Sequence, residues 1–115
     1  MNDMTRHIAV ATADHVATVV IDRAPHNHVN ARLVEALADT FEALDRDDDV
    51  RAIVLATEGK VFCGGADLTG EKPLADDSGE SETPALYTAA VRLFATKKPV
   101  VVAVQGAAVG AGLGV

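Results

Sequence analysis

Two glycine-rich stretches, each directly behind an apolar run, contain the groups best suited to chemistry. The first is Glu58–Leu68, which follows the apolar run Ala52–Thr57, and the second is Gln105–Gly114, which follows Pro99–Val104. Glycine has no Cβ, so the backbone N–H groups of such turns can closely approach a bound ligand. Two turns of this kind, each at the end of a strand, would supply two backbone donors to one oxygen atom. That arrangement is an oxyanion hole, which stabilises negative charge as it develops.

The glycine patterns also allow other interpretations. A simple glycine turn at a sheet edge explains the first stretch by itself as well as an oxyanion hole does. In the second stretch, a dinucleotide fingerprint would need glycine at position 115, where the chain has Val115. Neither stretch is followed by the Lys and Ser or Thr of a phosphate-binding loop, and the Gly-x-Ser-x-Gly nucleophile motif is absent. The pairing of two glycine turns behind two strands therefore remains the main signal.

The other reactive side chains favour structural interpretations. Cys63 has no base that the sequence places beside it, so we expect a small packing residue. The four carboxylates within Asp45–Asp49 lack the glycine pivot and terminal Glu of a calcium loop, and a solvated helix end explains them better. The histidines are expected on surface loops, with too few ligands for a metal site: His7, His15, His26 and His28.

Composition limits the class of protein and its partners. The 115 residues are 49% apolar and 23% charged, which predicts one globular domain or part of one. The net charge of −7 and the absence of a basic patch argue against nucleic acid as a partner. No apolar run is long enough for a membrane span, and the N-terminus does not read as a secretory signal. A single cysteine fits a reducing, cytoplasmic location.

Hydrophobic periodicity predicts strands and helices in alternation. Two short β-rich runs separated by a compact turn form a hairpin, and Asn30 stands where a helix N-cap belongs. The later strands are wholly apolar and are expected to be buried on both faces, as parallel strands are. The predicted elements are a hairpin of Ile8–Thr12 and Val16–Asp22, a helix over Ala31–Arg46, a strand over Ala52–Thr57, a helix over Pro84–Ala95 and a strand over Pro99–Val104. This order describes an α/β layered fold.

Two further expectations concern the second half of the chain. The buried side of the second helix is predicted to consist of Leu86, Ala90, Leu93 and Phe94. The segment Thr69–Thr83 is acidic and rich in turn residues, so it is expected to form a loop or a frayed helix. The sequence reaches residue 115 within what looks like the start of a helix, from which we expect the N-terminal part of a longer protein.

Three blocks together resemble the enoyl-CoA hydratase/isomerase (crotonase) superfamily. They are Gly-Lys-Val-Phe-Cys-Gly-Gly-Ala-Asp-Leu at 59–68, Pro-Val-Val-Val-Ala-Val-Gln-Gly-Ala-Ala-Val-Gly-Ala-Gly at 99–112, and the loop Ile-Asp-Arg-Ala-Pro-His-Asn-His-Val-Asn at 21–30. Their spacing also matches that family. The resemblance implies a crotonase-like, layered β-β-α spiral fold, with residues 1–115 as the N-terminal part of a single domain.

The same resemblance implies an acyl-CoA-processing enzyme. The backbone N–H groups of Ala66 and Ala111 would form the oxyanion hole for the thioester oxygen as it gains enolate charge. Coenzyme A, present only as part of the thioester substrate, would be bound by His28, Val29, Gly64, Asp67 and Leu68. No other cofactor is implied. Members of the family typically form trimers or dimers of trimers, so a homotrimer or hexamer is expected at full length.

Position 114 departs from the hydratase pattern. Hydratases of the family carry a catalytic glutamate four residues after the glycine that matches Gly110, and here that position is Gly114. A second acid/base carboxylate of the family would lie beyond residue 115. The resemblance therefore favours an isomerase-like reaction over hydration. A non-catalytic acyl-CoA-binding or assembly subunit with the same fold is the alternative.

Overall fold

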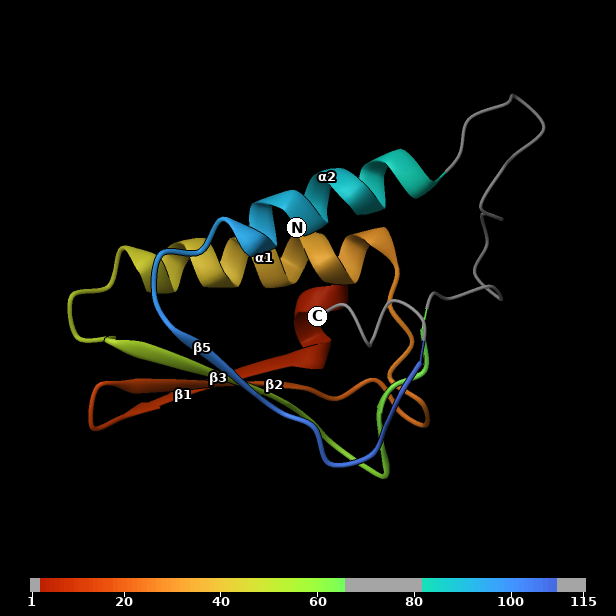
Figure 1. Cartoon of the computed structure of the whole chain (residues 1–115), viewed down its shortest axis with the longest axis horizontal. Coiled ribbons are helices and arrows are strands. Elements are labelled where there is room, and N and C mark those ends of the chain that lie inside the picture. The colour runs from red at the N-terminus through yellow and green to blue at the C-terminus, as the bar shows by residue number, and fades with distance from the viewer. Residues whose placement is uncertain (1–2, 66–81, 110–115) are drawn as a thin grey trace.

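The protein is a layer of two helices on one face of a four-stranded sheet, with a second, two-stranded sheet at one end. The computed structural model describes residues 3–65 and 82–109 (Figure 1). The elements are η1 (Asp3–His7), β1 (Ile8–Ala13), β2 (Val16–Ile21), α1 (Ala31–Asp45), β3 (Ala52–Thr57), β4 (Val61–Cys63), α2 (Glu82–Phe94), β5 (Val100–Ala103) and β6 (Ala107–Ala108). The predicted α/β layered fold is confirmed.

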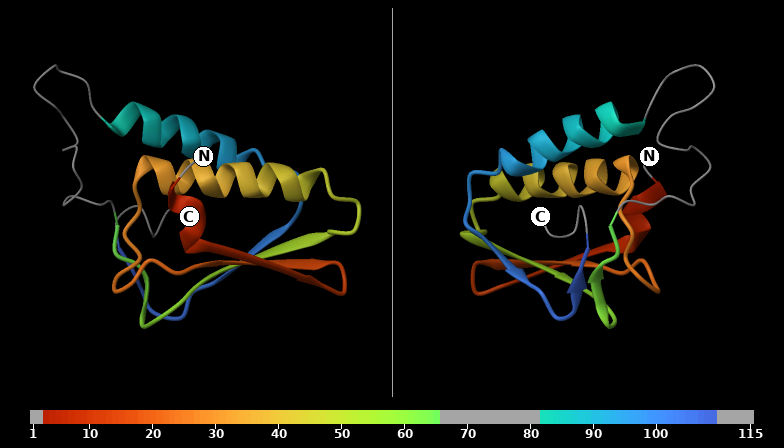
Figure 2. Two further views of the ribbon diagram at one scale, coloured as in Figure 1. Left: turned by 180° about the vertical axis from the view of Figure 1, so that it is seen from behind. Right: turned by 45° about the vertical axis from the view of Figure 1, so that its right-hand side comes forward.

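The large sheet has the order β1-β2-β3-β5, and both helices cover the same face of it (Figure 2). β1 and β2 form the predicted antiparallel hairpin, whose turn residues Asp14 and His15 have φ values of 52° and 67°. β3 pairs in parallel with β2 on one side and with β5 on the other. Parallel neighbours need a crossover connection, and α1 and α2 provide the two crossovers.

Helix α1 begins where the sequence predicted. Asn30 has extended backbone angles, and its side-chain oxygen accepts a hydrogen bond of 2.8 Å from the backbone N–H of Leu33. This cap satisfies one of the free N–H groups of the first turn. The apolar stripe then packs on the sheet, with Leu33 fully buried and Leu37 and Phe41 only 3% exposed. Burial of each such side chain contributes roughly 1.5 to 3 kcal/mol, so α1 is the main apolar cover of the sheet.

The prediction that the parallel strands are buried on both faces is wrong for this chain. In β3, Ile53 and Leu55 are buried beneath the helices, whereas Val54 on the opposite face is only half-buried. In β5, Val101 is 62% exposed. Successive side chains of a strand point to opposite faces, and among the described residues the helices cover only one face of this sheet. An apolar run therefore predicted the strands but not their exposure.

Helix α2 lies beside α1 and is joined to it by both apolar and charged contacts. Ala89 and Leu93 are buried, and the guanidinium of Arg92 contacts the carboxylates of Asp39 and Glu42 on α1. Hydrogen bonding to Arg92 lowers the pKa of the Glu42 carboxyl. These contacts fix α2 on the helix that covers the sheet.

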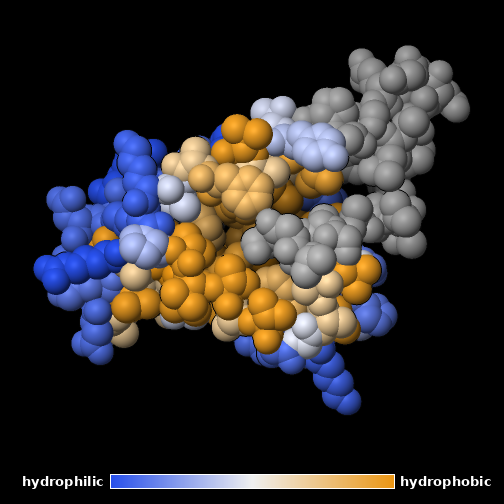
Figure 3. All heavy atoms as spheres, in the orientation of Figure 1, coloured by the Kyte–Doolittle hydropathy of each residue, from blue (hydrophilic) through white to orange (hydrophobic). Residues whose placement is uncertain are grey.

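The predicted buried side of α2 is wrong at Phe94, which is 65% exposed. Adjacent residues of a helix point about 100° apart, so Leu93 faces the core and Phe94 cannot. Phe94 instead continues an exposed stripe with Tyr87 and Val91. Figure 3 shows apolar side chains gathered on the face that carries α2 and β5.

Three short elements were not predicted: η1, β4 and β6. β4 and β6 pair in parallel as a separate small sheet. Strands of three and two residues are too short to show periodicity, and glycines flank both.

No helix within 3–65 and 82–109 is long and apolar enough to cross a membrane.

Candidate active site

The two glycine turns lie against each other at the end of the small sheet. β4 leads into Gly64 and Gly65, and β6 leads into Val109. The backbone N–H of Val109 donates a hydrogen bond of 2.9 Å to the carbonyl of Cys63. The predicted convergence of the two glycine stretches is therefore present up to the last described residue of each, Gly65 and Val109.

Glycine is required on both turns for different reasons. Gly65 has φ +89°, a left-handed conformation that side chains other than glycine rarely adopt. A Cβ on Gly65 would also lie 3.1 Å from the Val109 carbonyl oxygen. Gly106 has no positive φ, but a Cβ there would overlap the carbonyl oxygen of Lys60. The close approach of the two strands therefore depends on both glycines.

Three of the predicted ligand-binding residues are brought together at the first turn. The N–H of Gly64 donates to the carbonyl of His26 at 2.7 Å, and the N–H of Val29 donates to the carbonyl of Gly65 at 2.8 Å. A Cβ on Gly64 would lie 2.7 Å from Cε1 of His28. His28, Val29 and Gly64 are thus held together where the loop after β2 meets the end of β4, with the Val29 side chain in the core.

The other predicted site residues lie outside the described residues. These are both oxyanion-hole positions, Ala66 and Ala111, the two binding positions Asp67 and Leu68, and the departure from the hydratase pattern at Gly114. Their roles stay predictions. The described residues end one residue before Ala66, at Gly65, and two residues before Ala111, at Val109.

His28 has an unusual environment for a loop histidine. Its Nδ1 atom is buried and meets no hydrogen-bond partner in the described part of the chain. The rings of His26 and His28 make an edge contact with centroids 5.7 Å apart. The guanidinium of Arg23 donates a 2.7 Å hydrogen bond to the His28 carbonyl, which fixes the backbone of this loop. The expectation of a surface loop holds for His26, which is exposed, and holds only in part for His28, which lies in the same loop but is half-buried, with its ring close to Gly64.

Cys63 is the packing residue that the sequence predicted. It is 4% exposed and belongs to the apolar core beside Phe62. Burial raises the pKa of the Cys63 thiol above its ordinary value. A buried, protonated thiol is a poor nucleophile, so its position beside the turn is structural.

Two amide side chains that the sequence analysis did not single out hold the turn between β3 and β4. Asn27 is 2% exposed, and its Nδ2 donates to the carbonyls of Glu58 and Val61. Gln105 donates from Nε2 to the carbonyls of Thr57 and Gly59. Asn27 lies two residues after Pro25 in a polar loop, and Gln105 directly precedes Gly106. Neither pattern reveals a partner some 30 to 50 residues away in sequence.

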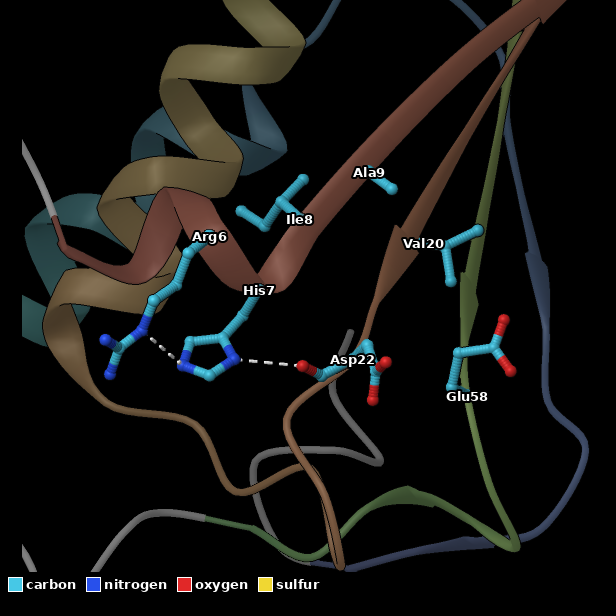
Figure 4. A pocket seen from close by; sticks show the side chains of 7 residues that line it. All are labelled: Arg6, His7, Ile8, Ala9, Val20, Asp22 and Glu58. Atoms are coloured by element: carbon cyan, nitrogen blue, oxygen red, sulfur yellow. Dashed lines mark hydrogen bonds between the residues drawn. The ribbon is translucent and has the colours of Figure 1, made fainter.

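A separate concavity of about 300 Å³ lies at the carboxyl ends of β2 and β3 (Figure 4). Within it, His7 donates from Nδ1 to the carbonyl of Asp22 at 2.9 Å, and Nε of Arg6 donates to Nε2 of His7. The carboxylates of Asp22 and Glu58 do not turn toward each other in this view. None of the predicted site residues lines this pocket, whose walls are Arg6, His7, Ile8, Ala9, Val20, Asp22 and Glu58.

Within the described residues, no group of three or more His, Cys, Asp or Glu side chains is placed to hold a metal ion.

The paired turns, beside a mixed sheet that has helices on one face, define the N-terminal portion of a crotonase-type fold. The family model for enoyl-CoA hydratase/isomerase matches residues 11–115. The chain belongs to the enoyl-CoA hydratase/isomerase family. Its relatives include a 4-chlorobenzoyl coenzyme A dehalogenase and probable enoyl-CoA hydratases.

Individual relatives agree with this assignment. The chain is 43% identical over 115 residues to 4-chlorobenzoyl coenzyme A dehalogenase-2 of Arthrobacter, covering 94% of this chain and 41% of that protein. It is 39% identical over 104 residues to the peroxisomal fatty acid beta-oxidation multifunctional protein of rice, covering 88% of this chain and 14% of that protein. A crystal structure of an enoyl-CoA hydratase/isomerase from Pseudoalteromonas atlantica superposes with a TM-score of 0.73 at 32% identity, covering 93% of this chain and 42% of that one. The chain thus spans less than half the length of these relatives.

Proposed function

We propose that this chain forms the oxyanion-hole half of an enzyme that processes acyl-CoA thioesters. The backbone N–H groups of Ala66 and Ala111 donate to the thioester carbonyl oxygen. One observation carries this proposal: the bond from the Val109 N–H to the Cys63 carbonyl holds the two turns side by side. Ala66 directly follows Gly65, and Ala111 lies two residues after Val109. Both donors therefore start from turns that are already in contact.

The chemistry that such a hole favours is proton transfer next to the thioester. Removal of a proton from C2 sends the electron pair to the carbonyl oxygen, where the two N–H groups stabilise the enolate. Each such donor typically contributes on the order of 3 kcal/mol to the transition state. Backbone donors suit this purpose because they are fixed before the reaction and need no reorganisation.

Gly114 favours isomerisation over hydration. Hydration uses two carboxylates, and the residue at this position has no side chain that could transfer a proton. Double-bond migration needs one carboxylate, which removes a proton from C2 and returns it to C4. We assign that carboxylate to a region equivalent to the part of the relatives that this sequence does not cover.

Binding of the coenzyme A portion is assigned to His28, Val29 and Gly64, where the loop after β2 meets the end of β4, together with Asp67 and Leu68. The contact of Gly64 with His28, and the Val29 N–H bond to Gly65, support this choice because they join the loop and the turn. No cofactor is proposed, because coenzyme A enters only as part of the thioester substrate. A cytoplasmic homotrimer or hexamer active in fatty acid metabolism is the accompanying expectation.

A non-catalytic acyl-CoA-binding or assembly subunit is the second candidate. The same glycine at position 114 favours it, because a binding protein can keep the backbone donors and lose the acid/base groups. The two candidates differ in turnover rather than in affinity for a CoA thioester.

The test begins with the protein purified at its native length, with its intact mass measured. It is then assayed with a 3-enoyl-CoA for double-bond migration, with a 2-enoyl-CoA for hydration, and with 4-chlorobenzoyl-CoA for chloride release. Migration that exceeds hydration supports the proposal. Tight thioester binding without turnover of any of the three supports the binding subunit. Absence of thioester binding contradicts both.

A further inference from the structure

The turn that joins β3 to β4 is held from two sides by amide side chains. On one side, Asn27 is almost fully buried, and its Nδ2 donates to the carbonyls of Glu58 and Val61 at 2.8 and 2.7 Å. Its Oδ1 accepts a 2.9 Å hydrogen bond from the N–H of Arg23. Every hydrogen-bonding atom of this side chain is therefore used, and two of its partners belong to the turn.

On the other side, Gln105 binds the same turn from the end of β5. Its Nε2 donates to the Thr57 carbonyl at 3.0 Å, to the Thr57 hydroxyl at 2.9 Å and to the Gly59 carbonyl at 3.0 Å. Gln105 is exposed, so no burial requirement explains these contacts. Gly106 follows directly, and its lack of a Cβ lets this backbone pass close to the carbonyl of Lys60.

The two side chains connect the turn to both halves of the candidate site. Asn27 belongs to the loop that also binds Gly64 and Gly65 through the backbone of His26 and Val29. That loop thus fixes both ends of β4. Gln105 fixes the start of β6, which leads to Val109 and its bond to Cys63.

We propose that Asn27 and Gln105 are positioning residues that set the spacing of the two turns of the oxyanion hole by clasping residues 57–61 between them. This inference rests on the proposed function, and it adds residues that touch neither the thioester nor its reacting atoms. The clasp requires donors, because all the turn atoms that it binds are carbonyl oxygens except the hydroxyl of Thr57. A carboxylate of the same shape would face these oxygens without a proton to donate.

Gln105 offers the cleaner test because it is exposed. Gln105→Glu keeps the shape and removes the donors, and Gln105→Met removes them without adding charge. Both variants should lower kcat about tenfold, change KM by less than twofold, and leave the far-UV spectrum unchanged. Lys60→Ala is the matched control, since Lys60 lies in the same turn with an exposed side chain, and it should keep the wild-type kcat.

Asn27 needs a second pair of variants because it is buried and has φ 52°. Asn27→Gly accepts that backbone and loses the side chain, whereas Asn27→Asp keeps the shape and loses the donors. Both should lower kcat by more than the Gln105 variants do, because Asn27 also fixes the loop. If Asn27→Asp is too unstable to purify, the kcat of Asn27→Gly alone tests the role of Asn27.

A readout without substrate separates this inference from the proposed function. In the ligand-free protein, hydrogen exchange at the amides of Gly64 and Val109 should accelerate about tenfold in the Gln105 variants and stay unchanged in Lys60→Ala. Unchanged exchange at both amides, or a kcat of Gln105→Glu and Gln105→Met equal to wild type, would overturn the clasp. If the wild-type protein turned over no thioester, the proposed function would fail, and the exchange measurement would still decide the inference.

Discussion

The two glycine turns of the candidate site use the same residue type for different physical reasons. At Gly65, glycine is needed for conformation, because φ is +89°. At Gly106, glycine is needed for space, because any Cβ would overlap the Lys60 carbonyl. The first turn thus depends on local backbone freedom and the second on long-range packing. Alanine at position 65 should therefore destabilise the protein mainly through backbone strain, and alanine at position 106 through a clash with neighbouring backbone.

The largest effect is expected for Gly106→Ala. The added Cβ meets backbone rather than a flexible side chain, so β6 must move away from β4. Overpacking of this kind costs about 3 kcal/mol. Urea denaturation should show that loss, together with loss of turnover. A variant as stable as wild type would show that the two strands are not this close.

Gly65→Ala should be the next most harmful change. A left-handed conformation costs alanine about 1 to 2 kcal/mol, and the new Cβ also crowds the Val109 carbonyl at 3.1 Å. Gly59→Ala is the matched control, because Gly59 has φ +87° with open space around it. Both should lose stability from strain, Gly65→Ala more because of the added contact with Val109, and Gly65→Ala should lose much more turnover than Gly59→Ala. Equal turnover in the two variants would contradict the role of the turn.

Gly64→Ala tests the contact between the first turn and the binding loop. The new Cβ would lie 2.7 Å from the His28 ring and 3.0 Å from the His26 carbonyl oxygen. The closest contact is with a side chain that can move, so the expected cost is about 1 kcal/mol. Affinity for coenzyme A should fall as the ring moves. In a double-mutant cycle, His28→Ala should recover much of the stability lost in Gly64→Ala. Strict additivity of the two changes would show that His28 does not pack on this turn.

The smallest effect is expected at a site remote from both turns. The hydrogen bond from Arg92 lowers the pKa of Glu42, so this pair stabilises the fold above the carboxyl's ordinary pKa of 4.5. That contribution is lost as the pH falls through the lowered pKa. Arg92→Ala should therefore lower Tm slightly at pH 7, less than any of the glycine variants, and the difference from wild type should shrink toward pH 3. An equal difference at both pH values would contradict the pairing.

Local signals predicted the elements well because they act within a few residues. Asn30 caps α1 through Leu33, three residues away, and the apolar runs predicted the long strands and helices in their observed order. The same signals could not predict exposure. Phe94 and Val101 are exposed because of which neighbours lie beside them, and an apolar sequence does not specify neighbours.

The site was predictable in part for the same reason. The glycines predicted two turns, and the family resemblance assigned those turns to an oxyanion hole. The roles of Asn27 and Gln105 were not predicted, because their partners, Val61 and Thr57, are distant in sequence and are bound through backbone carbonyls. Every residue has a backbone carbonyl, so the residue type of the partner does not indicate such a hydrogen bond. The roles of Ala66 and Ala111 remain predictions because both residues lie outside the described residues.

The central claim is that the N–H groups of Ala66 and Ala111 converge on one thioester oxygen. The most direct test is the infrared carbonyl stretch of a bound, non-reactive thioester labelled with ¹³C at that carbon. The stretch should move to lower frequency on binding, and much of the shift should vanish when the Ala111 amide is replaced by an ester through chemical ligation. The ester should also lower kcat by about 10² to 10³. A bound carbonyl that keeps its solution frequency, or an ester protein that shifts it as far as wild type does, would contradict the account.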